Sequence, residues 1–103
     1  MEFADVCIIG GGASGTFASI VSAERKKRVF LLEKNKTICK KLLLTGNKRC
    51  NLTNMADIEE FIEKYRNGDF LRNVFYQFFN TDLIDFFEKH GFCLLYTSDA
   101  ADE

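Results

Sequence analysis

The sequence predicts an α/β protein that opens with a parallel strand–helix–strand unit and continues as a series of amphipathic helices. Three observations support this prediction. Apolar runs at 4–9 and 29–33 are typical of parallel strands that are covered on both faces. Between them, residues 13–24 have the small and apolar composition of a helix, and a glycine-rich turn precedes them. The whole unit takes up about thirty residues, the size of a βαβ motif.

The composition is that of a globular protein with at most one domain: 103 residues, 47% hydrophobic and 28% charged. The formal net charge of −1 gives no reason to expect nucleic acid or an anionic membrane as a partner. No apolar run approaches the roughly 18 residues of a membrane span. The acidic start, residues 1–5, is unlike a signal peptide, so we expect a cytoplasmic protein. The basic run 25–28 follows the predicted helix and is interpreted as a solvated, favourable helix end.

The four cysteines predict neither a disulfide framework nor a metal site. They are widely spaced and form no C-x-x-C pair. We therefore expect reduced thiols and no bound metal. The cysteines are Cys7, Cys39, Cys50 and Cys93.

Beyond the second strand, residues 35–54 have no clear period and predict a long functional loop with one turn of helix. Three amphipathic helices are expected to follow. The first begins at a cap on Asn54 and stops at Gly68, and the third begins at Asn80 or Thr81 and stops at Gly91. Their phenylalanines are interpreted as core or interface residues. The apolar positions of the three stripes are Ile58, Phe61, Ile62 and Tyr65, then Leu71, Val74, Phe75, Phe78 and Phe79, and then Leu83, Ile84, Phe86 and Phe87.

The glycine-rich turn fits the pattern G-x-G-x-x-G of a Rossmann-like dinucleotide site. Its context, an apolar strand before and a helix after, is the one that this pattern requires. The first glycine permits the tight turn, the second lets a pyrophosphate approach the backbone, and the third lets helix and strand pack closely. For the serine, a hydroxyl contact to the ligand and simple helix-start chemistry remain equal alternatives. The predicted cofactor-contacting residues are Gly10, Gly11, Gly12, Ala13, Ser14 and Gly15.

Glu33 supplies the second element of the site. It ends the second apolar run, eighteen residues after Gly15, where an acidic residue is expected to accept hydrogen bonds from the adenosine ribose. A carboxylate at this position would repel a 2′-phosphate, which disfavours NADP here. The neighbouring Lys34 is included among the predicted contacts. Glycines and acid together do not separate FAD from NAD.

The stretch 40–54, KKLLLTGNKRCNLTN, makes the prediction more specific. From Lys41 to Asn54 it resembles the signature K-[IL]-x-x-[ST]-G-x-G-R-C-N-x-T-N of the bacterial NAD(P)/FAD-dependent oxidoreductase family, also described as YhiN-like, BaiN-like or aminoacetone-oxidase-like. The order of elements to about Phe92 is similar to that family's opening. Lys48 departs from the signature, because a small residue, often glycine, is usual there.

The resemblance implies FAD in a glutathione-reductase-like domain, with NAD(P)H as a possible electron donor and a small carbonyl, enone or amine compound as substrate. For Cys50, a flavin contact and an inert packed thiol remain equal alternatives. The catalytic residues are expected outside this sequence. The residues that the resemblance places near the flavin or its phosphates are Lys41, Thr45, Gly46, Arg49, Cys50 and Asn51.

Residues 1–92 are therefore interpreted as the incomplete N-terminal part of an FAD-binding domain, inactive alone, from a flavin-dependent oxidoreductase. The tail 93–103 resembles the translated read-through of a sequencing adapter and is expected to be non-native. Two alternatives remain open at this point: an NAD-dependent Rossmann dehydrogenase, and a non-catalytic nucleotide-binding module.

Overall fold

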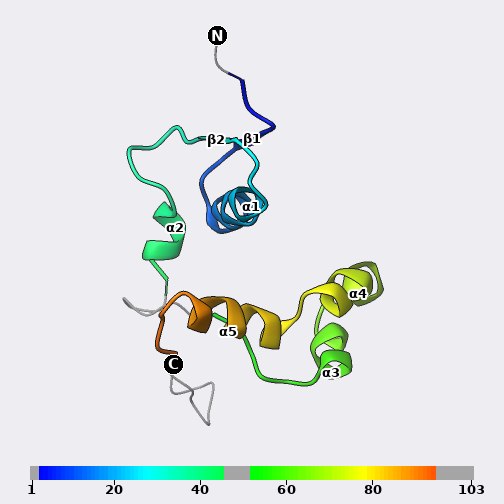
Figure 1. The fold of residues 1–103 in the computed structure, drawn as a ribbon. Helices are drawn as coiled ribbons and strands as arrows, with labels where there is room; N and C mark the ends of the chain where they lie inside the picture. Colours follow the sequence, from blue (N-terminus) through cyan, green and yellow to red (C-terminus); the bar gives the residue numbers. More distant parts are fainter. Residues whose placement is uncertain (1–2, 46–51, 95–103) are drawn as a thin grey trace. The chain divides into compact units, whose positions relative to one another are not determined.

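The computed structural model describes residues 3–45 and 52–94 (Figure 1). Contacts divide the chain into two compact units, Met1–Asn51 and Leu52–Glu103, and each is described by itself. Most of the tail predicted to be non-native, residues 95–103, lies outside the described residues. None of the helices in the described ranges is long and apolar enough to cross a bilayer.

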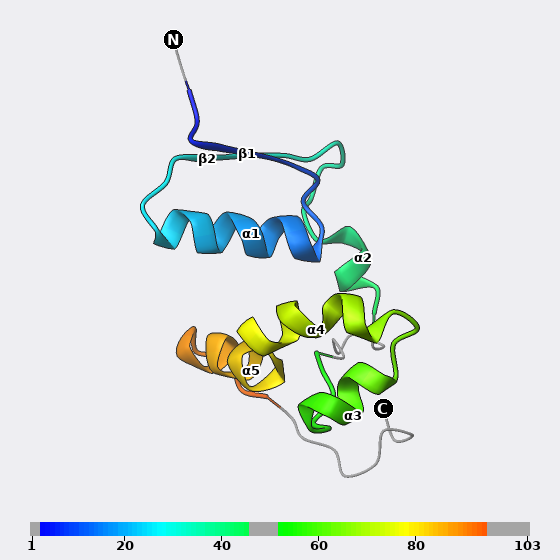
Figure 2. The same ribbon diagram turned by 90° about the vertical axis from the view of Figure 1, so that its right-hand side faces the viewer.

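The first unit is the predicted strand–helix–strand motif. Strand β1 (Val6–Ile9), helix α1 (Ala13–Glu24) and strand β2 (Val29–Leu32) follow one another, and the two strands pair in parallel. The register runs from Val6 opposite Val29 to Ile9 opposite Leu32. Figure 2 shows α1 running along one face of the strand pair. The α/β prediction is confirmed, and the helix bounds agree with the predicted 13–24.

The described residues cover only one of the two faces of the strand pair. Side chains of β1 alternate between half-buried and exposed, and Ile9 is 87% exposed while Leu32 is 53% exposed. The reason is that successive side chains of a strand point to opposite faces, and α1 covers one face only. The strands are also shorter than predicted, since they begin at Val6 and end at Leu32.

Helix α1 ends in a reversal that is usually made by glycine. The N–H of Lys26 donates to the Ala23 carbonyl (2.9 Å), and the N–H of Lys27 donates to the Ser22 carbonyl (3.1 Å). This is the Schellman pattern, and it places Lys26 in the left-handed region at φ 63°. The basic run therefore lies just beyond the helix, as its interpretation as a solvated helix end requires.

The second unit contains three helices, α3 (Ile58–Glu63), α4 (Gly68–Gln77) and α5 (Asn80–Lys89). Two predicted boundaries are wrong. Asp57, rather than Asn54, caps α3 by accepting from the Glu60 N–H (3.0 Å), because the Asn54 side chain already accepts from the Ala56 N–H (2.7 Å). Gly68 begins α4 instead of ending α3.

The predicted start of α5 at Asn80 is confirmed, but its cap is the residue before. The cap is Phe79, whose N–H donates to the Asp82 carboxylate (2.8 Å), so neither Asn80 nor Thr81 provides it. Both residues instead lie in the first turn. The predicted stop at Gly91 is confirmed, because Gly91 has φ +88° and its N–H donates to the Glu88 carbonyl (3.0 Å).

An aromatic cluster forms the centre of the second unit. The ring of Phe61 lies 5.1–5.8 Å, centre to centre, from the rings of Tyr65, Phe75 and Phe79. The buried apolar side chains among the described residues, Ile62 and Ile84, belong to the same unit. Phe61, Phe75 and Phe79 are half-buried and contact one another, which confirms the core interpretation for these phenylalanines, whereas Tyr65 is 44% exposed.

Two members of the second predicted stripe are not core residues. Val74 is 56% exposed and Phe78 is 40% exposed. Phe78 also lies beyond the end of α4, where the chain becomes extended. The helical period therefore breaks before the stripe is complete.

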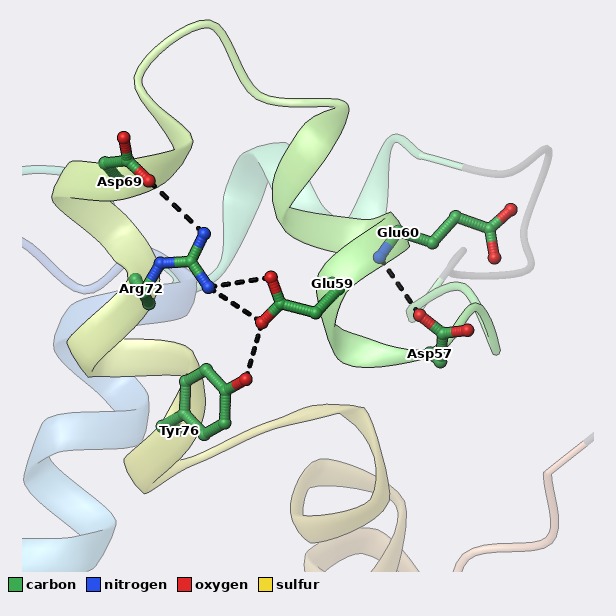
Figure 3. A network of polar contacts seen from close by, with 6 residues as sticks. All are labelled: Asp57, Glu59, Glu60, Asp69, Arg72 and Tyr76. Atoms are coloured by element: carbon green, nitrogen blue, oxygen red, sulfur yellow. Dashed lines mark hydrogen bonds and ion pairs between the residues drawn. The ribbon is translucent and has the colours of Figure 1, made fainter.

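A charged network joins α3 to α4 on the surface of the second unit (Figure 3). The Arg72 guanidinium donates to both carboxylate oxygens of Glu59 (2.8 and 2.7 Å) and to Asp69 (3.2 Å), and the Tyr76 hydroxyl donates to Glu59 (2.5 Å). Hydrogen bonds from Arg72, and then from Tyr76, lower the pKa of Glu59. The same carboxylate raises the pKa of Tyr76.

Candidate dinucleotide site

The glycine turn begins where β1 ends, and Gly10 makes its reversal. The N–H of Gly10 donates to the carbonyl of Leu32 at the end of β2 (2.8 Å), which ties the turn to the sheet. Gly10 has φ +102°, a conformation that side-chain-bearing residues rarely adopt. The first glycine of the motif is therefore required by backbone geometry.

Gly15 is required for a different reason, the close approach of α1 to the strand. A Cβ on Gly15 would overlap the carbonyl oxygen of Gly10 and lie 3.3 Å from the Ile8 side chain. Helix and strand can therefore pack at this distance only around glycine. This is the role predicted for the third glycine of the motif.

Gly12 faces open space at the N-terminus of α1. It is the N-cap residue, it has no side-chain cap, and a Cβ built on it would have no neighbour within 4 Å. Ala13 and Ser14 are exposed beside it. The first N–H groups of a helix have no partner within the helix, and together with the helix dipole they favour an anion. This opening is suited to a pyrophosphate.

Glu33 lies directly against the glycine turn. Its Oε1 accepts from the Gly11 N–H (2.8 Å) and its Oε2 accepts from the Asn35 N–H (2.7 Å). These two hydrogen bonds, that from Asn35 first, lower the pKa of Glu33, and the positive charge of Lys34 acts in the same direction. The carboxylate is thus held ionised, and each oxygen keeps a further lone pair for a ribose hydroxyl.

The segment after β2 returns to the glycine turn at Cys39. The Cys39 N–H donates to the Gly11 carbonyl (2.6 Å), and its thiol donates to the Thr16 hydroxyl (3.4 Å). Thr16 in turn donates to the same carbonyl (3.2 Å). Cys39 is also the N-cap of the short helix α2 (Lys40–Leu43), the single helical turn that was predicted in this loop.

The structure describes only part of the loop that follows. Lys41 is exposed on α2, and the Thr45 hydroxyl donates to the Leu42 carbonyl (2.8 Å) just after it. Both residues thus lie on the segment that begins at Cys39, where the chain contacts the glycine turn. The other predicted loop contacts, Gly46, Arg49, Cys50 and Asn51, lie outside the described residues.

Sequence reasoning missed three residues that contact Gly11: Thr16, Ile38 and Cys39. A Cβ on Gly11 would lie 2.9 Å from the Ile38 side chain and 3.2 Å from a Glu33 oxygen, so this buried position also requires glycine. The motif gives no signal that glycine is needed at position 11, because any residue is allowed at this place in G-x-G-x-x-G. The spacing of the cysteines predicts only a reduced thiol at Cys39, and this cysteine is free in the structure.

The residues present fit the adenosine diphosphate part of a dinucleotide. An open helix N-terminus lies beside a carboxylate held ionised, and Gly12 adds no Cβ to this opening. Among residues 3–45 and 52–94, no three potential metal-ligating side chains come together.

Fold and site together define a Rossmann-type dinucleotide-binding domain. Comparison with known families makes this assignment specific: the chain matches the HI0933-like protein Rossmann domain over residues 4–100. The chain belongs to this family, which confirms the resemblance to the NAD(P)/FAD-dependent oxidoreductases.

Three curated relatives are similar to most of this chain. The chain is 44% identical over 86 residues to a 3-dehydro-bile acid delta(4,6)-reductase of Clostridium scindens, which covers 82% of this chain and 21% of that protein. It is 36% identical over 91 residues to a ribosomal RNA dihydrouridine synthase of Escherichia coli K12, covering 88% of this chain and 22% of the relative. A synthase of the same name from Haemophilus influenzae is 28% identical over 90 residues, which is 87% of this chain and 22% of the relative. The chain therefore spans about a fifth of the length of these relatives.

Proposed function

We propose that this chain forms the adenosine-binding, N-terminal part of a longer FAD-dependent reductase that uses NAD(P)H as electron donor. The observation that carries the proposal is the hydrogen bond from the Gly11 N–H to Glu33 beside the open N-terminus of α1. Membership of the flavoprotein family and the identity to a named reductase support FAD over NAD as the ligand. Bound FAD would supply hydride transfer through its isoalloxazine ring.

The described residues would bind and orient the cofactor and take no part in the chemical step. Glu33 would accept hydrogen bonds from the ribose hydroxyls, and the first N–H groups of α1 would face the pyrophosphate. Lys41 would add positive charge near the phosphates. Gly46, Arg49, Cys50 and Asn51 remain predicted flavin contacts on the strength of the signature. The catalytic residues would come from the remainder of the longer protein.

The substrate proposed first is a small molecule with a C=C bond conjugated to a carbonyl group. The names of the relatives support this class, because one denotes reduction of a 3-oxo diene and the other denotes saturation of the uracil ring. Each named conversion adds two hydrogen atoms across such a bond. The enone named among the expected substrate classes is thus favoured over a simple amine.

A second candidate substrate is a uridine in structured RNA. Residues 1–51 carry ten lysine and arginine residues against four aspartate and glutamate residues, whereas residues 52–103 carry four against eleven. The overall charge of −1 conceals this separation. A basic surface on the first unit would favour a phosphate backbone.

The test is to purify the intact protein that contains these residues and measure its cofactor and its substrate. A yellow protein whose flavin is reduced by NADH or NADPH supports the proposal. Reoxidation of that flavin by a steroidal enone, or by a uridine-containing ribosomal RNA fragment, distinguishes the two substrate candidates. A colourless protein that binds NAD would instead indicate a dehydrogenase. A protein that binds nucleotide but transfers no electrons would indicate a non-catalytic module.

A further inference from the structure

The peptide group of Gly11 is held from three directions. Its N–H donates to Glu33 (2.8 Å), and its carbonyl accepts from both the Cys39 N–H (2.6 Å) and the Thr16 hydroxyl (3.2 Å). The three partners come from different segments: the end of β2, the loop before α2, and α1. We call this arrangement the Gly11 clamp.

The clamp is closed by side chains as well as by backbone groups. The Cys39 thiol donates to the Thr16 hydroxyl (3.4 Å), so two of the three partners also contact each other. Ile38 lies so close to Gly11 that an added Cβ would come within 2.9 Å of its methyl group. Gly11 is buried, although Gly10 and Gly12 on either side of it are exposed.

Cys39 adopts an uncommon backbone conformation at this point. Its φ is 58°, in the left-handed region that costs an L-residue free energy. Such a conformation persists where surrounding contacts fix it. Here the backbone N–H and the thiol of the same residue provide those contacts. The Cys39 carbonyl then accepts from Leu43 (3.0 Å) and begins α2.

We propose that Thr16, Ile38 and Cys39 are positioning residues for the dinucleotide, because the Gly11 clamp fixes the Glu33 carboxylate and the start of α2 against the same peptide group. The inference rests on the proposed function and deepens it. Loosening the clamp would let Glu33 move away from the ribose. It would also release the loop that carries Lys41 from the glycine turn.

The first test is a double-mutant cycle in the intact flavoprotein, freed of FAD and titrated with FAD and, separately, with ADP. Thr16→Val removes the hydroxyl and should weaken the binding of both ligands about 2- to 10-fold. Cys39→Ala removes the thiol but leaves residue 39 in its left-handed conformation. It should weaken binding less than Thr16→Val does. In the Thr16→Val background, Cys39→Ala should weaken binding no further, because the hydroxyl that the thiol contacts is already absent.

Cys39→Ser is the conservative variant, since a hydroxyl can still donate to Thr16, and should restore affinity to within about twofold of the native protein. Cys7→Ala removes a thiol on β1 that is not part of the Gly11 clamp, so it is the matched control and should leave affinity unchanged. The KM for the reducible substrate should not move in any of these variants, because the clamp acts at the adenosine end of the cofactor.

The second test uses the space around Gly11. Gly11→Ala should weaken ADP binding at least about 10-fold, because the new methyl group displaces Ile38 or Glu33. Adding Ile38→Ala should recover part of that loss by giving the methyl group room. If Gly11→Ala does not fold, the double-mutant cycle with Thr16 and Cys39 tests by itself whether the clamp positions the dinucleotide.

The outcomes separate the two proposals. If the native protein binds neither FAD nor ADP, the proposed function and the inference both fail. If it binds them and the Thr16 and Cys39 variants bind equally well, only the inference is overturned. Additive losses in the double variant would also contradict it, since they would mean that the thiol and the hydroxyl act independently.

Discussion

Gly12→Ala should weaken FAD binding with little effect on stability, whereas Gly15→Ala should lower the stability of the fold itself. At Gly12, which has φ −79° and no neighbour within 4 Å of an added Cβ, alanine costs no packing. Alanine restricts the unfolded chain, which stabilises, but it is a poorer N-cap than glycine, which destabilises, so the free energy of unfolding of the FAD-free protein should change by less than about 1 kcal/mol. The new methyl group projects into the opening proposed for the pyrophosphate, so FAD affinity should fall at least about 10-fold.

At Gly15 the methyl group would overlap a backbone carbonyl that cannot rotate away. The Gly10 carbonyl carbon would lie 3.1 Å from the added Cβ and the Ile8 side chain 3.3 Å from it. Helix α1 would have to move away from β1, at a cost of about 2 kcal/mol or more in the free energy of unfolding. FAD binding would be lost as a consequence of this displacement.

The assay is urea unfolding of the FAD-free intact protein, followed by circular dichroism, together with FAD titration by flavin fluorescence. Native protein and both variants are measured in the same buffer. The reasoning fails if Gly12→Ala lowers the free energy of unfolding as much as Gly15→Ala does. It also fails if Gly12→Ala binds FAD with native affinity.

Three further predictions concern single side chains. Lys26→Gly should raise the free energy of unfolding by about 0.5–1 kcal/mol, because φ 63° suits glycine, whereas Lys27→Gly should lower it; thermal unfolding of the two variants gives the comparison. The lowered pKa of Glu33 implies a contribution to folding that is complete above the ordinary glutamate pKa and lost as the pH falls through the lowered value; Glu33→Gln should therefore flatten the acid limb of a stability-against-pH curve, and an unchanged limb would exclude this. Arg72→Met should lower the free energy of unfolding only slightly, since the ion pair with Glu59 is exposed. This loss should vanish in about 1 M salt, whereas any loss from the control Lys64→Met should not depend on salt.

The strand–helix–strand unit could be predicted because its signals are local. A glycine turn and a run of charged residues mark the two ends of α1, and the predicted bounds agree with the structure. The glycines and Glu33 also came together as expected, since the parallel register brings the end of β2 beside the turn. Chain order and strand pairing are sufficient to specify these contacts.

The errors arose where several polar groups compete for the same role. Asn54 and Asp57 are both good cap residues, and the choice between them depends on the Ala56 N–H, which occupies the Asn54 side chain. The contact of Cys39 with Gly11 spans 28 residues and has no periodic signal. Tertiary hydrogen bonds of this kind leave no pattern in a single sequence, so this part of the site could be found only in the structure.

The parallel pairing of β1 and β2 has a consequence for the timing of folding. Each pair of partner residues is separated by 23 positions, and the helix between them is local, so the unit can close early in synthesis. At about 5–20 residues per second, the ribosome adds the residues up to Leu32 within about 2–6 s. Ile9 and Leu32 would then be exposed on the nascent chain until later residues of the proposed longer protein cover them. A ribosome-associated chaperone would therefore be expected to engage this sheet face before the longer protein is complete.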